Sequence, residues 1–263
     1  GDVPVLEPGP GETPLWGNTR ITGLFDPGVD MDDVLADLRS SLALEQLPDH
    51  HLETLADRDW EREWLRDFRP MRFGSRLWIC PADSKPDRPD AVIVRLDPGL
   101  AFGTGTHATT AMCLEWLDTI DLQGRTLLDY GCGSGVLAIA ALKLGSGRAH
   151  AMDIDVQAVT ATLGNALQNG VEDRLTVSAA EQDIHGQFDV VVANILAGPL
   201  VELAASISDR VKSGGQLALS GILSEQATEV LHAYAPWVDF DQPVLRQQDG
   251  QTWVRLTGRK WQG

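Results

Sequence analysis

The sequence has few of the residues on which disulfide frameworks, metal sites and membrane spans depend. Its three cysteines, Cys80, Cys113 and Cys132, are widely spaced, which argues against a disulfide framework and a structural zinc site. Its six histidines form no H-E-x-x-H motif, so we predict that no metal is bound. No apolar run approaches the roughly 20 residues of a membrane span. The opening "GDVPVLEPGPGETPLWG" has neither the basic start nor the apolar core of a signal peptide, so we expect a cytoplasmic protein without a membrane partner.

Positive charge is also scarce. Lys and Arg together number 21 against 38 Asp and Glu, and the formal net charge is −17. Proteins that bind nucleic acid use Lys and Arg to neutralise the phosphate backbone, so this balance argues against direct nucleic-acid binding. The same charge fits a cationic partner, and it fits equally well a role in solubility alone.

The 263 residues are enough for one large domain and one small domain. Residues 1–60 read as a small α+β unit, residues 61–70 as a linker helix that Pro70 ends, and residues 71–263 as the main domain. The elements predicted in the small unit are a strand, a helix with Asp30 as its N-cap, and a second strand, at 19–26, 30–44 and 50–60. The main domain begins with two strands that flank a proline-rich loop.

From Gly124 onward, short apolar runs alternate with helical patterns. The predicted strands are 125–131, 148–155, 174–180, 188–194 and 216–222, and the predicted helices are 135–145, 156–170, 199–215 and 223–235. The segment 243–258 reads as a hairpin around Asp249–Gly250. This order predicts an α/β fold, with a mostly parallel sheet covered by helices on both faces and an antiparallel hairpin at one edge.

The segment "LLDYGCGSG" contains a glycine loop between a strand and a helix. Glycine lets the backbone approach a ligand closely, and the helix N-terminus offers unpaired N–H groups. A dinucleotide fingerprint would need glycine at position 136, which is Val136, so a nicotinamide-dependent oxidoreductase is disfavoured. Asp129, just before the loop, suits a cofactor that carries an ammonium or sulfonium charge.

The next predicted strand ends in "AMDID". An acidic side chain at this position can accept hydrogen bonds from both ribose hydroxyls, and Asp153 is the candidate. Asp155 reads as the N-cap of the following helix. Together, the glycine loop, Asp129 and Asp153 indicate S-adenosyl-L-methionine as the cofactor.

Several segments resemble the PrmA family, the bacterial methyltransferases of large-subunit ribosomal protein eleven: "LDPGLAFGTGTHATT", "LLDYGCGSGVLAIAALKLG", "AMDID", "VVANILAGPL" and "MRFGSRLWICP". The resemblance implies a class I methyltransferase fold with a seven-stranded Rossmann-like sheet. It also implies a ferredoxin-like N-terminal domain that recognises the substrate and begins some tens of residues earlier in the family than in this chain.

By the same resemblance, the reaction would transfer methyl groups to lysine side chains and the N-terminal α-amine of a basic ribosomal protein. Thr110, Gly131, Asp153 and Asn194 match cofactor-contacting positions, and Phe102 is a looser match in the covering loop. Gly133 and Asp129 complete the predicted cofactor site. We expect a monomer.

Asn194 ends the strand "FDVVVAN", where a side chain can face the ligand. A lysine ammonium has no lone pair, and its pKa of about 10.4 makes the neutral amine cost roughly 4–5 kcal/mol at pH 7. An amide oxygen can accept the N–H bonds of the neutral amine and direct its lone pair, so Asn194 is the predicted catalytic residue. The alternative role is a turn-forming amide. His107 is either a general base or, as we favour, a structural residue.

The sequence alone leaves two other functions open. Methyltransferases of nucleobase amines also use Asn or Asp at this strand end, followed by prolines and a stacking aromatic ring. Here Ile195, Leu196 and Ala197 follow and offer no ring. A non-catalytic module that holds the cofactor structurally is the other alternative, and the intact Asn194 position argues against it.

Overall fold

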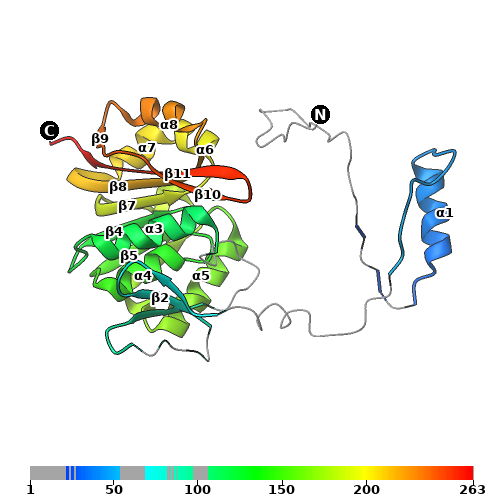
Figure 1. The fold of residues 1–263 in the computed structure, drawn as a ribbon, viewed down its shortest axis with the longest axis horizontal. Coiled ribbons are helices and arrows are strands. Elements are labelled where there is room, and N and C mark those ends of the chain that lie inside the picture. The colour runs from blue at the N-terminus through cyan, green and yellow to red at the C-terminus, as the bar shows by residue number, and fades with distance from the viewer. Residues whose placement is uncertain are drawn as a thin grey trace. The chain divides into compact units, whose positions relative to one another are not determined.

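The computed structural model of the chain describes residues 22–23, 25–26, 28–53, 69–81, 84, 86, 88–96 and 106–262 (Figure 1). The chain divides into two units, Gly1–Asp59 and Trp60–Gly263.

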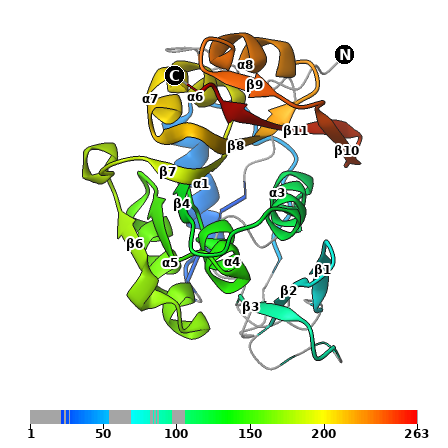
Figure 2. The ribbon, with the colours of Figure 1, turned by 90° about the vertical axis from the view of Figure 1, so that its left-hand side faces the viewer.

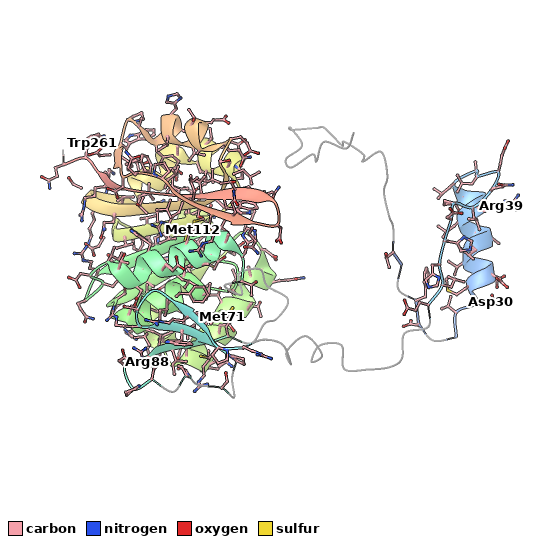
Figure 3. All side chains as sticks on the ribbon, in the orientation of Figure 1. Asp30, Arg39, Met71, Arg88, Met112 and Trp261 are labelled. Atoms are coloured by element: carbon pink, nitrogen blue, oxygen red, sulfur yellow. The ribbon has the colours of Figure 1, made fainter. Side chains whose placement is uncertain are left out.

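The first unit contains helix α1 (Met31–Ser41). Asp30 caps it, because its side chain accepts a hydrogen bond from the backbone N–H of Asp32 at 2.9 Å. Asp30 and Arg39 lie toward opposite ends of this helix (Figure 3), in keeping with the helix dipole. The predicted helix and its cap are therefore confirmed. Within the strands predicted at 19–26 and 50–60, residues 22–23, 25–26 and 50–53 are described and none of them is in a strand, whereas the rest of these segments and most of the linker helix predicted at 61–70 lie outside the described residues. The ferredoxin-like arrangement therefore stays a prediction.

The second unit opens with a small sheet of β1 (Met71–Phe73), β2 (Leu77–Cys80) and β3 (Val92–Arg95). β2 and β3 are the two strands predicted there, and they run parallel, whereas β1 is an additional antiparallel strand. Asp118 of helix α3 (Ala108–Thr119) anchors the β1–β2 turn. Its carboxylate accepts hydrogen bonds from the Ser75 N–H and hydroxyl at 2.5 and 2.7 Å and from Arg76 Nε at 3.3 Å.

The main sheet has the strand order β10-β11-β8-β7-β4-β5-β6, with β9 paired to β11. Its members are β4 (Thr126–Tyr130), β5 (Arg148–Met152), β6 (Leu175–Ser178), β7 (Phe188–Asn194), β8 (Val211–Leu223), β9 (Val238–Phe240), β10 (Val244–Gln248) and β11 (Gln251–Lys260). The strands from β8 to β6 are parallel, and β11 is antiparallel to its neighbours. The predicted α/β fold with a mostly parallel, Rossmann-like sheet is thus confirmed, as is the closing hairpin, where Asp249 and Gly250 both adopt positive φ.

Helices cover both faces of this sheet (Figure 2). They are α3, α4 (Val136–Leu144), α5 (Val156–Asn169), α6 (Ala197–Glu202), α7 (Ala204–Asp209) and α8 (Ala227–Tyr234), with single turns η2 (Glu172–Arg174) and η3 (Glu181–Asp183). Neighbouring strand residues face opposite sides, so Leu127 packs in one core cluster with α3 and α4, and Leu128 in another with α6 to α8.

The single helix predicted over 199–215 is wrong. The helical segment breaks at Leu203, whose φ of −95° and ψ of 9° leave the helical range, and α7 ends at Asp209. β8 already begins at Val211, which is fully buried and pairs with Phe188 of β7. Burial of Val211 in the sheet therefore overrides the local helical pattern, and Gly214, with a φ of +71°, could not continue a helix.

Asp189 of β7 provides a test of stability against pH. Its carboxylate bonds to Lys212 Nζ at 2.8 Å and accepts from the Thr126 N–H and hydroxyl at 2.9 and 2.7 Å. Burial raises the pKa of Asp189, but the Lys212 and Thr126 bonds lower it more, to about 2. The folded state therefore prefers the carboxylate, and the resulting stabilisation is present above pH 4 and lost as pH falls toward 2.

We expect Asp189→Asn to lower the free energy of unfolding by about 1–2 kcal/mol at pH 7, a value reduced for solvent screening of this partly exposed carboxylate. The difference from wild type should shrink by about half at pH 3. Urea unfolding at both pH values measures it, with Asp173→Asn in the exposed η2 turn as the control for loss of one charge. A difference that is constant with pH would contradict the assignment.

Candidate cofactor and acceptor site

Three polar side chains lie at the carboxyl edge of the parallel strands. Asp129 is near the end of β4, Asp153 follows β5, and Asn194 is the last residue of β7. Strand register brings the ends together, since Tyr130 of β4 pairs with Met152 of β5 on one side and Ala193 of β7 on the other. Following the chain, β5 and β6 are added on one side of β4, and β7 and β8 are then added on its other side. Open α/β sheets bind ligands at such a switch point.

The glycine loop between β4 and α4 depends on left-handed backbone conformations. Gly131, Gly133 and Gly135 have φ values of +76°, +54° and +75°. The N–H groups of Gly131 and Cys132 donate to the Met152 carbonyl at 2.8 and 2.9 Å, which holds the loop against the end of β5. Because glycine adopts these angles without strain, the loop forms a close backbone cradle at the start of α4.

Asp153 fixes this cradle from the neighbouring strand. One carboxylate oxygen accepts from the Gly133 N–H at 2.8 Å, and the other accepts from the Asp155 N–H at 3.0 Å. Each oxygen has a second lone pair, so the side chain can still accept ribose hydroxyls. Asp155 caps α5 through the Gln157 N–H at 2.8 Å, which confirms its predicted role as an N-cap.

Asp129 is buried under the loop. Its Oδ2 accepts from the Ala138 N–H of α4 at 3.1 Å, whereas Oδ1 is buried without a hydrogen-bond partner among the residues that the structure describes. Burial raises the pKa of this carboxyl to about 7, and the nearby Asp153 adds to the rise. A buried oxygen without a donor is unfavourable, so the site fits a ligand that brings a cationic or N–H group.

Asn194 forms its hydrogen bond through the amide nitrogen. Nδ2 donates to the hydroxyl of Thr110 on α3 at 3.1 Å. Thr110 is buried and Asn194 is half-buried. The bond fixes the plane of the carboxamide and leaves Oδ1 as the atom that can accept from an amine. Thr110, predicted as a cofactor contact, thus lies against the predicted catalytic side chain.

His107 has a structural position at the start of α3. Its side chain caps the helix, with Nδ1 accepting from the Thr109 N–H at 3.4 Å. The ring also packs edge-on against Trp253, with centroids 4.6 Å apart. Burial lowers the pKa of the imidazole, although Asp249 opposes this, and the neutral form keeps Nδ1 as an acceptor.

Ile195 and Gly221 shape the site but were not predicted as part of it. A side chain at Gly131 would collide with the Ile195 side chain, and one at Gly221 would collide with the Ile195 backbone. The loop after Asn194 therefore passes between two glycines. Gly221 lies inside the predicted strand "QLALSGI", and a glycine there can indicate close backbone approach. Phe102 lies outside the described residues, so its role stays a prediction.

Comparisons with known proteins agree with this geometry. Residues 1–261 match the family model of ribosomal protein L11 methyltransferase (PrmA). The L11 methyltransferase of Actinobacillus pleuropneumoniae serotype 5b is 55% identical over 262 residues, covering 98% of this chain and 87% of that protein. The enzyme of Escherichia coli strain 55989 is 55% identical over 260 residues, with the same coverage.

A crystal structure of the ribosomal protein L11 methylase from Lactobacillus delbrueckii superimposes with a TM-score of 0.67 at 33% identity, covering 74% of this chain and all of that one. Within the described ranges, no helix combines the length and apolar character needed to span a bilayer. From the family match and these relatives, we conclude that the chain belongs to the ribosomal protein L11 methyltransferase (PrmA) family.

Proposed function

We propose that this chain transfers methyl groups from S-adenosyl-L-methionine to amino groups of ribosomal protein L11, in the cytoplasm, with Asn194 positioning the acceptor nitrogen. Family membership supports the substrate and the cofactor. The acceptor amines, by resemblance to the family, are lysine side chains and the N-terminal α-amine. The observation that carries the catalytic assignment is the Asn194–Thr110 hydrogen bond at the end of β7, beside the glycine loop.

Four residues of the predicted cofactor site are proposed to hold the cofactor, whereas Thr110 and Asn194, which were predicted as cofactor contacts, are proposed to act on the acceptor. Gly131 and Gly133 provide the cradle, Asp153 accepts from the ribose hydroxyls, and the buried Oδ1 of Asp129 accepts from a cationic group. When bound, S-adenosyl-L-methionine supplies an activated methyl group on a sulfonium, which an uncharged amine can take by displacement.

Asn194 acts on the acceptor. Its Oδ1 accepts an N–H bond from the neutral amine and directs the nitrogen lone pair, while Thr110 prevents rotation of the carboxamide. Because the carboxamide is uncharged, it does not stabilise the ammonium form as a carboxylate would. The ammonium proton leaves to solvent before transfer, and positioning supplies most of the acceleration.

The geometry does not favour a nucleobase as the acceptor. The residue after Asn194 is Ile195, which is held between Gly131 and Gly221 and cannot stack on a base. The net charge of −17 is also unsuited to a nucleic-acid backbone.

The test is to incubate the protein with S-adenosyl-L-methionine and purified, unmethylated L11 and to weigh the product by intact mass. We expect mass increases in whole methyl steps that fragmentation assigns to lysines and the N-terminus. L11 with an acetylated N-terminus should lose only the α-amine steps. An unchanged mass of L11, with methyl groups appearing on ribosomal RNA in a parallel incubation that contains it, would refute the proposal.

A further inference from the structure

Besides its N-cap His107, the start of helix α3 is held by a residue that is distant in the sequence. The first N–H groups of a helix have no partner within it, and the first turn of α3 contains no acidic residue. The Ala108 N–H donates instead to Oε1 of Gln248, the last residue of β10, at 2.6 Å. The helix start is therefore tied to the β10–β11 hairpin and not only to its own preceding loop.

Further contacts join the same two elements. Trp253 of β11 packs on His107, Arg255 Nη1 donates to the Met112 carbonyl at 2.5 Å, and Arg246 pairs with Glu115 at 2.7 Å. Figures 1 and 2 both show α3 beside the hairpin, and Met112 is labelled on α3 in Figure 3. The hairpin therefore contacts α3 from the first residue of the helix, Ala108, as far as Glu115.

Thr110 comes two residues after Ala108, so the position of the first turn decides where its hydroxyl lies. That hydroxyl accepts from Asn194 Nδ2 of β7. The Ser220 hydroxyl makes a second connection, since it lies 3.4 Å from the Thr109 carbonyl and 3.2 Å from the Val254 carbonyl of β11. Gln248 and Asn194 are therefore connected through the first turn of α3, by way of Ala108 and Thr110.

We propose that Gln248 is a positioning residue for methyl transfer, which holds the first turn of α3 so that Thr110 orients the Asn194 carboxamide. This inference rests on the proposed role of Asn194. Catalytic geometry tolerates little displacement, and a shift of about 1 Å can cost about 100-fold in rate. We expect the loss of one hydrogen bond to shift the helix start by less than this, and therefore to have a smaller effect.

Four variants separate positioning from general stability. Gln248→Leu removes the acceptor and should lower kcat about 10-fold with an unchanged KM for L11. Gln248→Glu keeps a carboxyl oxygen for the Ala108 N–H, and a negative charge is favourable at a helix start, so its kcat should be near wild type. Gln247→Leu is the matched control, because Gln247 is exposed on the same strand and should have no effect. Thr110→Val removes the hydroxyl through which Gln248 is proposed to act.

The decisive measurement is a double-mutant cycle on kcat. If Gln248 acts through Thr110, Gln248→Leu should have little further effect in a Thr110→Val background. Independent, multiplying losses would overturn the proposal, as would an unchanged kcat in Gln248→Leu. Full activity of Thr110→Val would also overturn the proposal, whereas full activity of Asn194→Ala would refute the role proposed for Asn194 itself, so the two failures are distinguishable.

Discussion

Replacement of Asn194 by alanine is expected to lower kcat by about 100- to 1,000-fold while the affinity for S-adenosyl-L-methionine changes little. The carboxamide is fixed by Thr110 through Nδ2, and its Oδ1 is the group proposed to hold the acceptor amine. Removing one preorganised hydrogen-bonding group from an active site has effects of this size, because the nitrogen loses its aligned position. Single-turnover methylation of L11 measures the loss, and calorimetric titration measures cofactor binding.

A second variant tests whether this loss of activity is specific to acceptor positioning. Asn194→Asp keeps an acceptor oxygen of the same shape, and the Thr110 hydroxyl can donate to it. Its negative charge, however, would favour the ammonium form of the substrate, so activity should recover in part only at a higher pH. If Asn194→Ala retained more than half of the wild-type kcat with a normal unfolding midpoint, Asn194 would be a structural turn residue.

The fold and the edge of the site were predictable because their signals are local. Parallel strands flanked by helices appear in the sequence as short apolar runs that alternate with helical patterns. Polar residues at the carboxyl ends of such strands lie at one edge of the sheet. Asp129, Asp153 and Asn194 are therefore predicted at one edge of the sheet from the sequence alone, and the structure places them there. The Asp155 cap could be predicted for the same reason, since its partner is two residues away.

Contacts between distant segments could not be predicted in this way. Gln248 and Ala108 are 140 residues apart, and nothing in either local pattern indicates that they meet. Likewise, Val211 belongs to β8 because it pairs with Phe188, so the pattern of its own neighbours predicted a helix wrongly. Tertiary pairing overrides local propensity at such positions.

Asp129→Asn should stabilise the protein without cofactor and weaken cofactor binding. Burial raises the pKa of Asp129 to about 7, so the folded state holds a proton that the unfolded state releases near pH 4. The free energy of unfolding therefore falls as pH rises from about 4 to 7, by on the order of 2–4 kcal/mol. Asparagine carries no charge, so above pH 7 the variant avoids the cost of burying a carboxylate. Its unpartnered amide N–H group offsets part of this gain, and the variant should be more stable than wild type by about 1–3 kcal/mol.

The same carboxylate is proposed to accept from a cationic group of the cofactor, so its loss should weaken binding about 10- to 100-fold at pH 8. Wild-type affinity should also increase as pH rises through about 7, since the proton on Asp129 competes with the ligand, and the variant should lack this dependence. Thermal unfolding and calorimetric titration between pH 6 and 8 test both statements.

Asp155→Asn is the control, because Asp155 caps α5 at the same edge of the sheet and its loss should leave cofactor affinity unchanged. Equal affinities of wild type and Asp129→Asn would mean that the unpartnered oxygen does not face the ligand, and the stability gain alone would then reflect burial of charge.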